Sequence, residues 1–72
     1  MALVDMRSLL DAARKDGYAV GAFNIVDYAT FRAVMEAAEE ERSPVIIQTS
    51  ASSTVKFYGY DVLVAMARAL AG

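Results

Sequence analysis

The 72-residue chain contains no cysteine and no histidine. Without cysteine it forms no disulfide and offers no thiol nucleophile, and without either residue type it lacks the ligands of ordinary zinc sites. These absences exclude imidazole and thiolate chemistry by this chain alone. Basic residues are also few: seven Lys and Arg stand against nine Asp and Glu, a formal net charge of −2. Because proteins that bind nucleic acid through phosphate contacts usually carry a basic excess, we expect no nucleic-acid partner.

Long hydrophobic runs are missing as well. The longest apolar run, residues 62–67, is far shorter than the roughly 20 residues that span a bilayer. The N-terminus has neither the basic region nor the apolar core of a signal peptide. We therefore expect a soluble, cytoplasmic protein with no membrane partner.

Hydrophobic residues nevertheless make up 57% of the chain, above the roughly 45–50% of an average soluble domain. A domain of this length buries only about 60% of the surface that its unfolded chain exposes. It is only marginally stable without cross-links or partner proteins. No repeat, low-complexity tract or linker interrupts the sequence, and its single proline is Pro44. The sequence predicts that residues 1–72 form one incomplete domain.

Apolar periodicity and capping residues divide the chain into alternating helices and strands. Asp5 is a typical N-cap and Gly17 a typical C-terminal stop for a first amphipathic helix. The run at residues 45–47 is β-branched without alternation, as expected for a parallel strand covered on both faces. The expected elements are a helix at 6–16, a strand at 18–24, a helix at 28–42, a strand at 45–49, a helical turn at 55–58 and a helix at 60–71.

This order predicts the α/β class, with a right-handed βαβ unit and flanking helices. Two parallel strands cannot close a sheet, and the helix at 60–71 is apolar around nearly its whole circumference. We therefore expect further protein to cover the strands and this helix.

The residues that follow the two strands are the best candidates for a binding site, because ligands of parallel α/β proteins bind at the carboxyl ends of the strands. These residues are Asn24 and Ser50. The Asn24 amide can bind a sugar hydroxyl or satisfy local backbone groups. The Ser50 hydroxyl can bind a substrate hydroxyl or phosphate, or it can cap a helix or stabilise a turn. The residue types alone leave these alternatives open.

Two further clusters give weaker signals. The hydroxyls at residues 50–54 with Lys56 resemble a phosphate-binding patch, although no glycine-rich loop accompanies them. The glutamates within residues 36–41 lie on a predicted helix far from the strand ends. We interpret them as a solvated helix face rather than an acid/base pair.

Two segments resemble the start of class II fructose-bisphosphate aldolases. They are residues 17–24, with the sequence GYAVGAFN, and residues 36–50, with the sequence EAAEEERSPVIIQTS. The family includes tagatose-bisphosphate aldolases and folds as a (β/α)8 barrel preceded by a helix. The resemblance implies that this chain is an N-terminal fragment of such a barrel, with the helix at 6–16 as the capping helix and two βα units after it.

The resemblance also implies a reaction. The full-length protein would reversibly cleave fructose 1,6-bisphosphate to dihydroxyacetone phosphate and glyceraldehyde 3-phosphate in glycolysis and gluconeogenesis. In the family, Zn²⁺ held by three histidines polarises the ketose carbonyl and stabilises the enediolate. Those ligands and the catalytic residues would lie beyond Gly72, so we expect no metal ligand and no catalytic residue within this chain.

Only Asn24 and Ser50 match substrate-pocket positions of the family. Ser50 would contact the glyceraldehyde-3-phosphate portion, and Asn24 would help to hold the sugar or the enediolate. The full-length protein would be a homo-oligomer, and the 72-residue chain alone would be inactive. Two alternatives stay open: a fragment of a tagatose-bisphosphate aldolase, and a non-catalytic α/β module that self-associates through its unpaired strands and the helix at 60–71.

Overall fold

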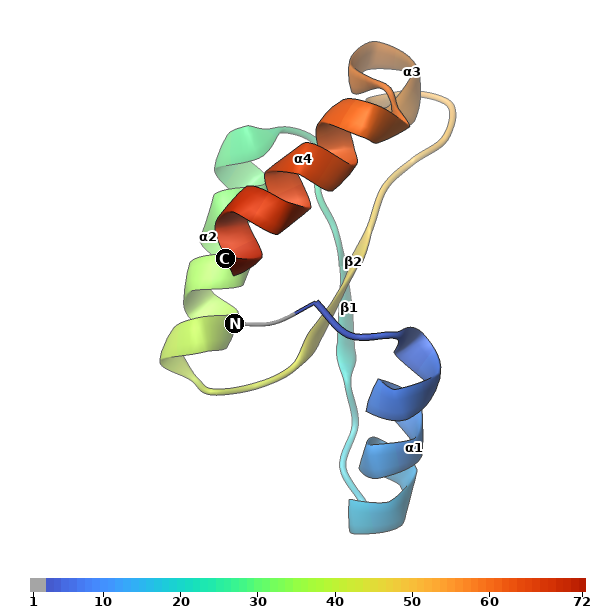
Figure 1. Ribbon diagram of the computed structural model, residues 1–72, viewed down its shortest axis with the longest axis vertical. Helices are drawn as coiled ribbons and strands as arrows, with labels where there is room; N and C mark the ends of the chain where they lie inside the picture. The colour runs from blue at the N-terminus through green and yellow to red at the C-terminus, as the bar shows by residue number, and fades with distance from the viewer. Residues whose placement is uncertain (1–2) are drawn as a thin grey trace.

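Residues 3–72, which the computed structural model describes, form four helices and two parallel strands (Figure 1). In chain order the elements are α1 (Met6–Asp16), β1 (Gly21–Asn24), α2 (Tyr28–Glu40), β2 (Val45–Gln48), α3 (Thr54–Tyr58) and α4 (Tyr60–Ala71). The predicted α/β class is confirmed. No helix within residues 3–72 is both long enough and apolar enough to cross a membrane.

The helix N-termini follow from their capping residues. The Asp5 carboxylate accepts a hydrogen bond from the Ser8 N–H at 2.6 Å and so starts α1. At α2, the Asp27 carboxylate accepts from the Thr30 N–H at 2.8 Å, while Thr30 Oγ1 accepts from the Asp27 N–H at 3.1 Å. This reciprocal pair is a capping box, and it satisfies two N–H groups that would otherwise lack partners.

Helix α2 ends at Glu40, earlier than the predicted residue 42. Arg42 adopts the left-handed conformation, with a φ of 52°. The Ser43 N–H then donates to the Ala38 carbonyl at 2.9 Å. The chain therefore leaves the helix through a left-handed residue, a common helix ending that favours glycine.

The strands are shorter than predicted. β1 begins at Gly21 rather than at residue 18, because Gly21 is the first residue with a partner on β2. The Tyr18 N–H instead donates to the Ala13 carbonyl at the end of α1. β2 begins at Val45, which pairs with Gly21. β2 ends at Gln48 rather than at residue 49. The ladder is thus limited to the positions at which both chains are extended.

Helices α2 and α4 contact each other and lie on the same side of the two strands, whereas α1 lies apart from both (Figure 1). The core forms where α2 and α4 meet the chain that leaves β1. Its buried residues are Ile25, Phe31, Met35, Leu63 and Ala71. In α1 the only buried residue is Ala13. The buried core therefore lies on the α2 and α4 side of the molecule.

Candidate functional site

The carboxyl ends of β1 and β2 lie at the same edge of the sheet. The parallel register pairs Asn24, the last residue of β1, with Gln48, the last residue of β2. Neighbouring strands are about 4.8 Å apart, so these two amide side chains start from adjacent backbone positions. Both residues are exposed. Asn24 is predicted from the sequence, whereas Gln48 is not, although a polar residue directly after the apolar run at 45–47 is a usable signal.

Ser50 lies in the loop between β2 and α3, two positions after Gln48 in the sequence. Its hydroxyl oxygen is 3.1 Å from that of Ser52, and either group can donate. The N-cap position of α3 belongs to Ser53, which makes no capping hydrogen bond through its side chain. The helix-cap alternative for Ser50 is therefore wrong, whereas the turn alternative stays open, and the exposed Ser50 hydroxyl belongs to the loop that follows β2.

The loop after β1 is held by hydrogen bonds from several directions. The Ile25 N–H donates to the Gln48 carbonyl at 3.0 Å, and the Thr54 hydroxyl donates to the Ile25 carbonyl at 3.5 Å. The Val26 N–H donates to Thr30 Oγ1 at 3.0 Å. Because Ile25 and Thr54 are both buried, their contacts are shielded from water. Asn24 thus precedes a loop whose path is fixed.

The capping box places a carboxylate beside this loop. The backbone N–H of Thr30, and secondly its hydroxyl, hydrogen-bond to Asp27 and hold the pKa of its carboxyl below the usual value of 3.8. A negative charge at this position also interacts favourably with the N-terminus of α2. The Asp27 carboxylate is therefore ionised at neutral pH and acts as a structural acceptor.

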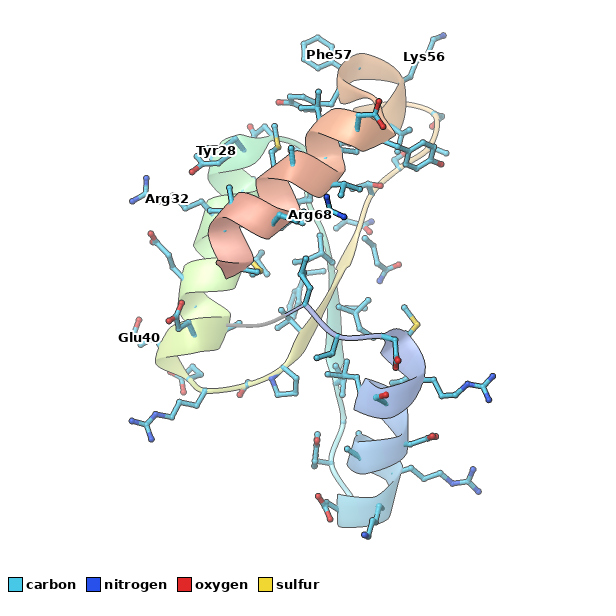
Figure 2. All side chains as sticks on the ribbon, in the orientation of Figure 1. Tyr28, Arg32, Glu40, Lys56, Phe57 and Arg68 are labelled. Atoms are coloured by element: carbon cyan, nitrogen blue, oxygen red, sulfur yellow. The ribbon has the colours of Figure 1, made fainter. Side chains whose placement is uncertain are left out.

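The predicted phosphate-binding patch is assembled only in part. Ser50 and Ser52 lie within hydrogen-bonding distance of each other, but the Thr54 hydroxyl is buried and bonded to Ile25. Figure 2 shows Lys56 projecting from α3 away from the strands. Lys56 therefore does not complete an anion site with these hydroxyls.

The glutamates at the end of α2 and at its C-cap are solvated, as predicted. Glu36, Glu39, Glu40 and Glu41 are all exposed. Glu36 pairs with Arg32 one helical turn earlier, at 2.8 Å, and this hydrogen bond raises the pKa of the Arg32 guanidinium. Such exposed pairs contribute little to stability because water and salt screen them.

An apolar cleft of about 860 Å³ lies between the N-terminal segment, α2, β2 and α4. Its walls include Leu9, Met35, Ile47 and Leu63. Neither Asn24 nor Ser50 lines it, although Thr49, which directly precedes Ser50, does. Within residues 3–72, no group of three or more acidic side chains is arranged to hold a metal ion.

The family model for class-II fructose-bisphosphate aldolase matches residues 4–72. The chain belongs to this family. The resemblance inferred from residues 17–24 and 36–50 is thereby confirmed. In this family member, the polar edge formed by Asn24, Gln48 and Ser50 is the candidate functional site.

Curated relatives agree with the family match. The chain is 43% identical over 70 residues to a probable fructose-bisphosphate aldolase of Bacillus subtilis, covering 97% of this chain and 25% of the relative. It is 43% identical over 68 residues to a fructose-bisphosphate aldolase of Helicobacter pylori, covering 94% and 22%. It is 51% identical over 53 residues to a fructose-bisphosphate aldolase of Pseudomonas aeruginosa, covering 74% and 15%. The chain therefore spans a quarter or less of the length of these aldolases.

Proposed function

We propose that the chain is the N-terminal part of an aldolase that reversibly cleaves fructose 1,6-bisphosphate to dihydroxyacetone phosphate and glyceraldehyde 3-phosphate. The observation that carries this proposal is the family match over residues 4–72. The relatives bear the name fructose-bisphosphate aldolase, which favours fructose over tagatose bisphosphate as the substrate. The full-length protein is proposed to be a cytoplasmic homo-oligomer.

The proposed full-length fold is a (β/α)8 barrel, in which α1 precedes the barrel and β1–α2 and β2–α4 are its first two units. The parallel pairing of β1 and β2 supports this arrangement. So does the apolar surface around them: the cleft is largely hydrophobic, and the Phe23 side chain on β1 is 46% exposed. Later strands and helices would cover these groups.

Asn24 and Ser50 are the proposed substrate-binding residues. Their place at the carboxyl ends of neighbouring strands supports this role, because active sites of barrel enzymes lie at that face. The Ser50 hydroxyl would bind the glyceraldehyde-3-phosphate portion, and the Asn24 amide would donate to and accept from the sugar or the enediolate.

The described residues do not fit the Zn²⁺ that the family resemblance implies. The chain has no histidine or cysteine, and residues 3–72 contain no suitable group of acidic side chains. We therefore assign no step of the metal chemistry to these residues. In the proposal, the 72-residue chain alone does not cleave the sugar.

A chimera tests the proposed function. Residues 1–72 replace the corresponding N-terminal region of the Bacillus subtilis relative, and cleavage of fructose 1,6-bisphosphate is followed with added zinc. We expect a folded chimera with aldolase activity. The unmodified relative is the positive control.

Two results would contradict the proposal. A chimera that folds but does not cleave fructose 1,6-bisphosphate would contradict the proposal that the chain is part of an aldolase. Cleavage by the purified 72-residue chain would show that the chemistry does not need further residues. The alternative of a self-associating module predicts instead a folded oligomer of defined size when the 72-residue chain is analysed by sedimentation.

A further inference from the structure

The backbone of Ile25 is held on both sides by the segment that carries Ser50. Its N–H donates to the Gln48 carbonyl at 3.0 Å, and its carbonyl accepts from the Thr54 hydroxyl at 3.5 Å. The Thr54 contact joins residues 29 positions apart in the sequence. We call this pair of hydrogen bonds the Ile25 clamp.

The clamp is buried. Ile25 is 1% exposed and Thr54 is 4% exposed, and Thr54 is the only buried polar side chain within residues 3–72. Hydrogen bonds in such a position compete little with water, and a polar group left without its partner there is costly. In the sequence, Thr54 belongs to the group of hydroxyls that resembles a phosphate-binding patch, whereas in the structure its side chain is buried and bonded to the Ile25 carbonyl.

The clamp links the two proposed substrate-binding residues. Asn24 immediately precedes Ile25, and Ser50 lies in the loop between the two anchors, Gln48 and Thr54. The Ser50 carbonyl also accepts from the Val55 N–H at 3.0 Å, so Ser50 is bonded to the residue after Thr54. A displacement of Thr54 from Ile25 would therefore move Ser50 relative to Asn24.

We propose that Thr54 is a positioning residue that sets the location of Ser50 relative to Asn24 through the Ile25 clamp. Thr54 itself does not touch substrate. This inference rests on the proposed function, because it assumes that Asn24 and Ser50 bind the sugar bisphosphate. The long O···O separation indicates a modest effect rather than a complete loss of binding.

Two matched pairs of side chains isolate the hydroxyl. Thr54→Val keeps the shape of threonine and removes the donor. Thr54→Ser keeps the donor and removes the methyl group, and Thr54→Ala lacks both, so serine and alanine differ only in the hydroxyl. If valine at this position prevented folding, the serine and alanine pair would still measure the same quantity. Ser53→Ala is the control, since Ser53 is exposed and its side chain makes no capping bond.

The experiment measures kcat and KM for fructose 1,6-bisphosphate in the protein at its native length. Thr54→Val is expected to raise KM about three- to tenfold with little change in kcat, the effect of losing a hydrogen bond that supports substrate binding. Thr54→Ser and Ser53→Ala are expected to stay within about twofold of the wild type. In a Ser50→Ala background, Thr54→Val is expected to add little, because the residue that it positions has been removed.

Hydrogen exchange of the Ile25 and Val55 amides gives a second readout that does not depend on activity. Faster exchange at both amides in Thr54→Val, reversed in Thr54→Ser, would support the clamp. Faster exchange with an unchanged KM would overturn the inference by making Thr54 purely structural, as would equal rises of KM in the valine and serine variants. An inactive wild-type protein would instead overturn the proposed function, whatever the variants did.

Discussion

The two ends of the strands differ in how the chain is held. At the carboxyl ends of β1 and β2, hydrogen bonds from side chains hold the loops. At the amino ends, the chain turns mainly through left-handed residues and hydrogen bonds between backbone groups. The carboxyl-end loops depend on the Asp27–Thr30 capping box and on the Thr54 hydroxyl. The amino-end turns depend on Gly17, with a φ of 73°, and on Arg42, with a φ of 52°. Side-chain bonds fix neighbouring groups in a specific geometry, which a binding site requires. Backbone turns only return the chain to the sheet.

This contrast distinguishes the end of the sheet that we propose for substrate binding from the end that only connects helices to strands. Asn24 and Ser50 lie where side-chain hydrogen bonds define the loop path. The turns at the amino ends tolerate any residue that preserves the backbone conformation. Substitutions at the two ends are therefore expected to differ in kind: those at the carboxyl end change activity or buried packing, and those at the amino end change only backbone strain.

The largest expected effect comes from the buried residue of the carboxyl-end loop. Ile25→Ala is expected to lower the free energy of unfolding by about 2–5 kcal/mol, because it removes a fully buried side chain and leaves a cavity. The neighbouring Val26 is 61% exposed, and Val26→Ala is expected to cost less than about 0.5 kcal/mol. Urea denaturation of the chimera followed by circular dichroism measures both. Equal losses in the two variants would show that the loop is not held by burial of Ile25.

A pair of serines tests the contrast for activity. Ser50→Ala at the carboxyl end is expected to lower kcat/KM for fructose 1,6-bisphosphate roughly tenfold, the effect of one lost hydrogen bond to a charged substrate. Ser43→Ala at the amino end removes a hydroxyl that donates only to the Glu41 carbonyl, at 3.3 Å. It is expected to leave kcat/KM unchanged. Steady-state kinetics of the two chimeras measures kcat/KM for each variant. Similar losses of kcat/KM in both would contradict the proposed difference between the two ends.

Much of the helical structure could be predicted because its signals are local. Helix α1 spans the predicted residues 6–16 because Asp5 and Gly17 make the capping contacts expected of them. Helix α4 likewise spans the predicted residues 60–71. The start of β1 could not be predicted in the same way, because it depends on where its partner strand begins.

The site was predictable only to the level of strand ends. The polar residue Asn24 after an apolar run indicated the edge of the sheet, but the pairing of Asn24 with Gln48 needed the strand register. The burial of the Thr54 side chain could not be predicted, because its hydrogen-bond partner, the Ile25 carbonyl, lies 29 positions away and the local sequence pattern does not indicate it. The left-handed conformation of Arg42 could not be predicted either, since a helix ending of that kind usually carries glycine.

That left-handed residue provides a prediction for the amino end. Arg42→Gly is expected to raise the free energy of unfolding by about 0.5–1 kcal/mol, because glycine adopts a positive φ without the clash that an L side chain makes. Arg14→Gly is the matched control. Arg14 lies in the last turn of α1 with ordinary helical geometry, and glycine there is expected to cost about 1 kcal/mol. Opposite signs in denaturation experiments support the role of backbone strain, whereas destabilisation by both substitutions would contradict it.

The smallest expected effect concerns pH at the carboxyl end. Hydrogen bonds from the Thr30 N–H and hydroxyl hold the pKa of the Asp27 carboxyl below its usual value of 3.8 in the folded protein. As the pH falls, the Asp27 carboxyl is therefore protonated in the unfolded chain before it is protonated in the folded protein. The contribution of Asp27 to stability is complete above about pH 4 and is lost as the pH falls through the folded-state pKa. Asp27→Asn keeps a capping oxygen but does not titrate, and it is expected to flatten the dependence of the unfolding midpoint on pH below 4. Thr30→Val is expected to flatten this dependence only in part, because it removes the hydroxyl donor but leaves the backbone N–H, which is the larger cause of the lowered pKa. Thr30→Ser keeps both donors. A wild-type slope in the Asp27→Asn variant would mean that the carboxyl-end cap does not respond to its charge.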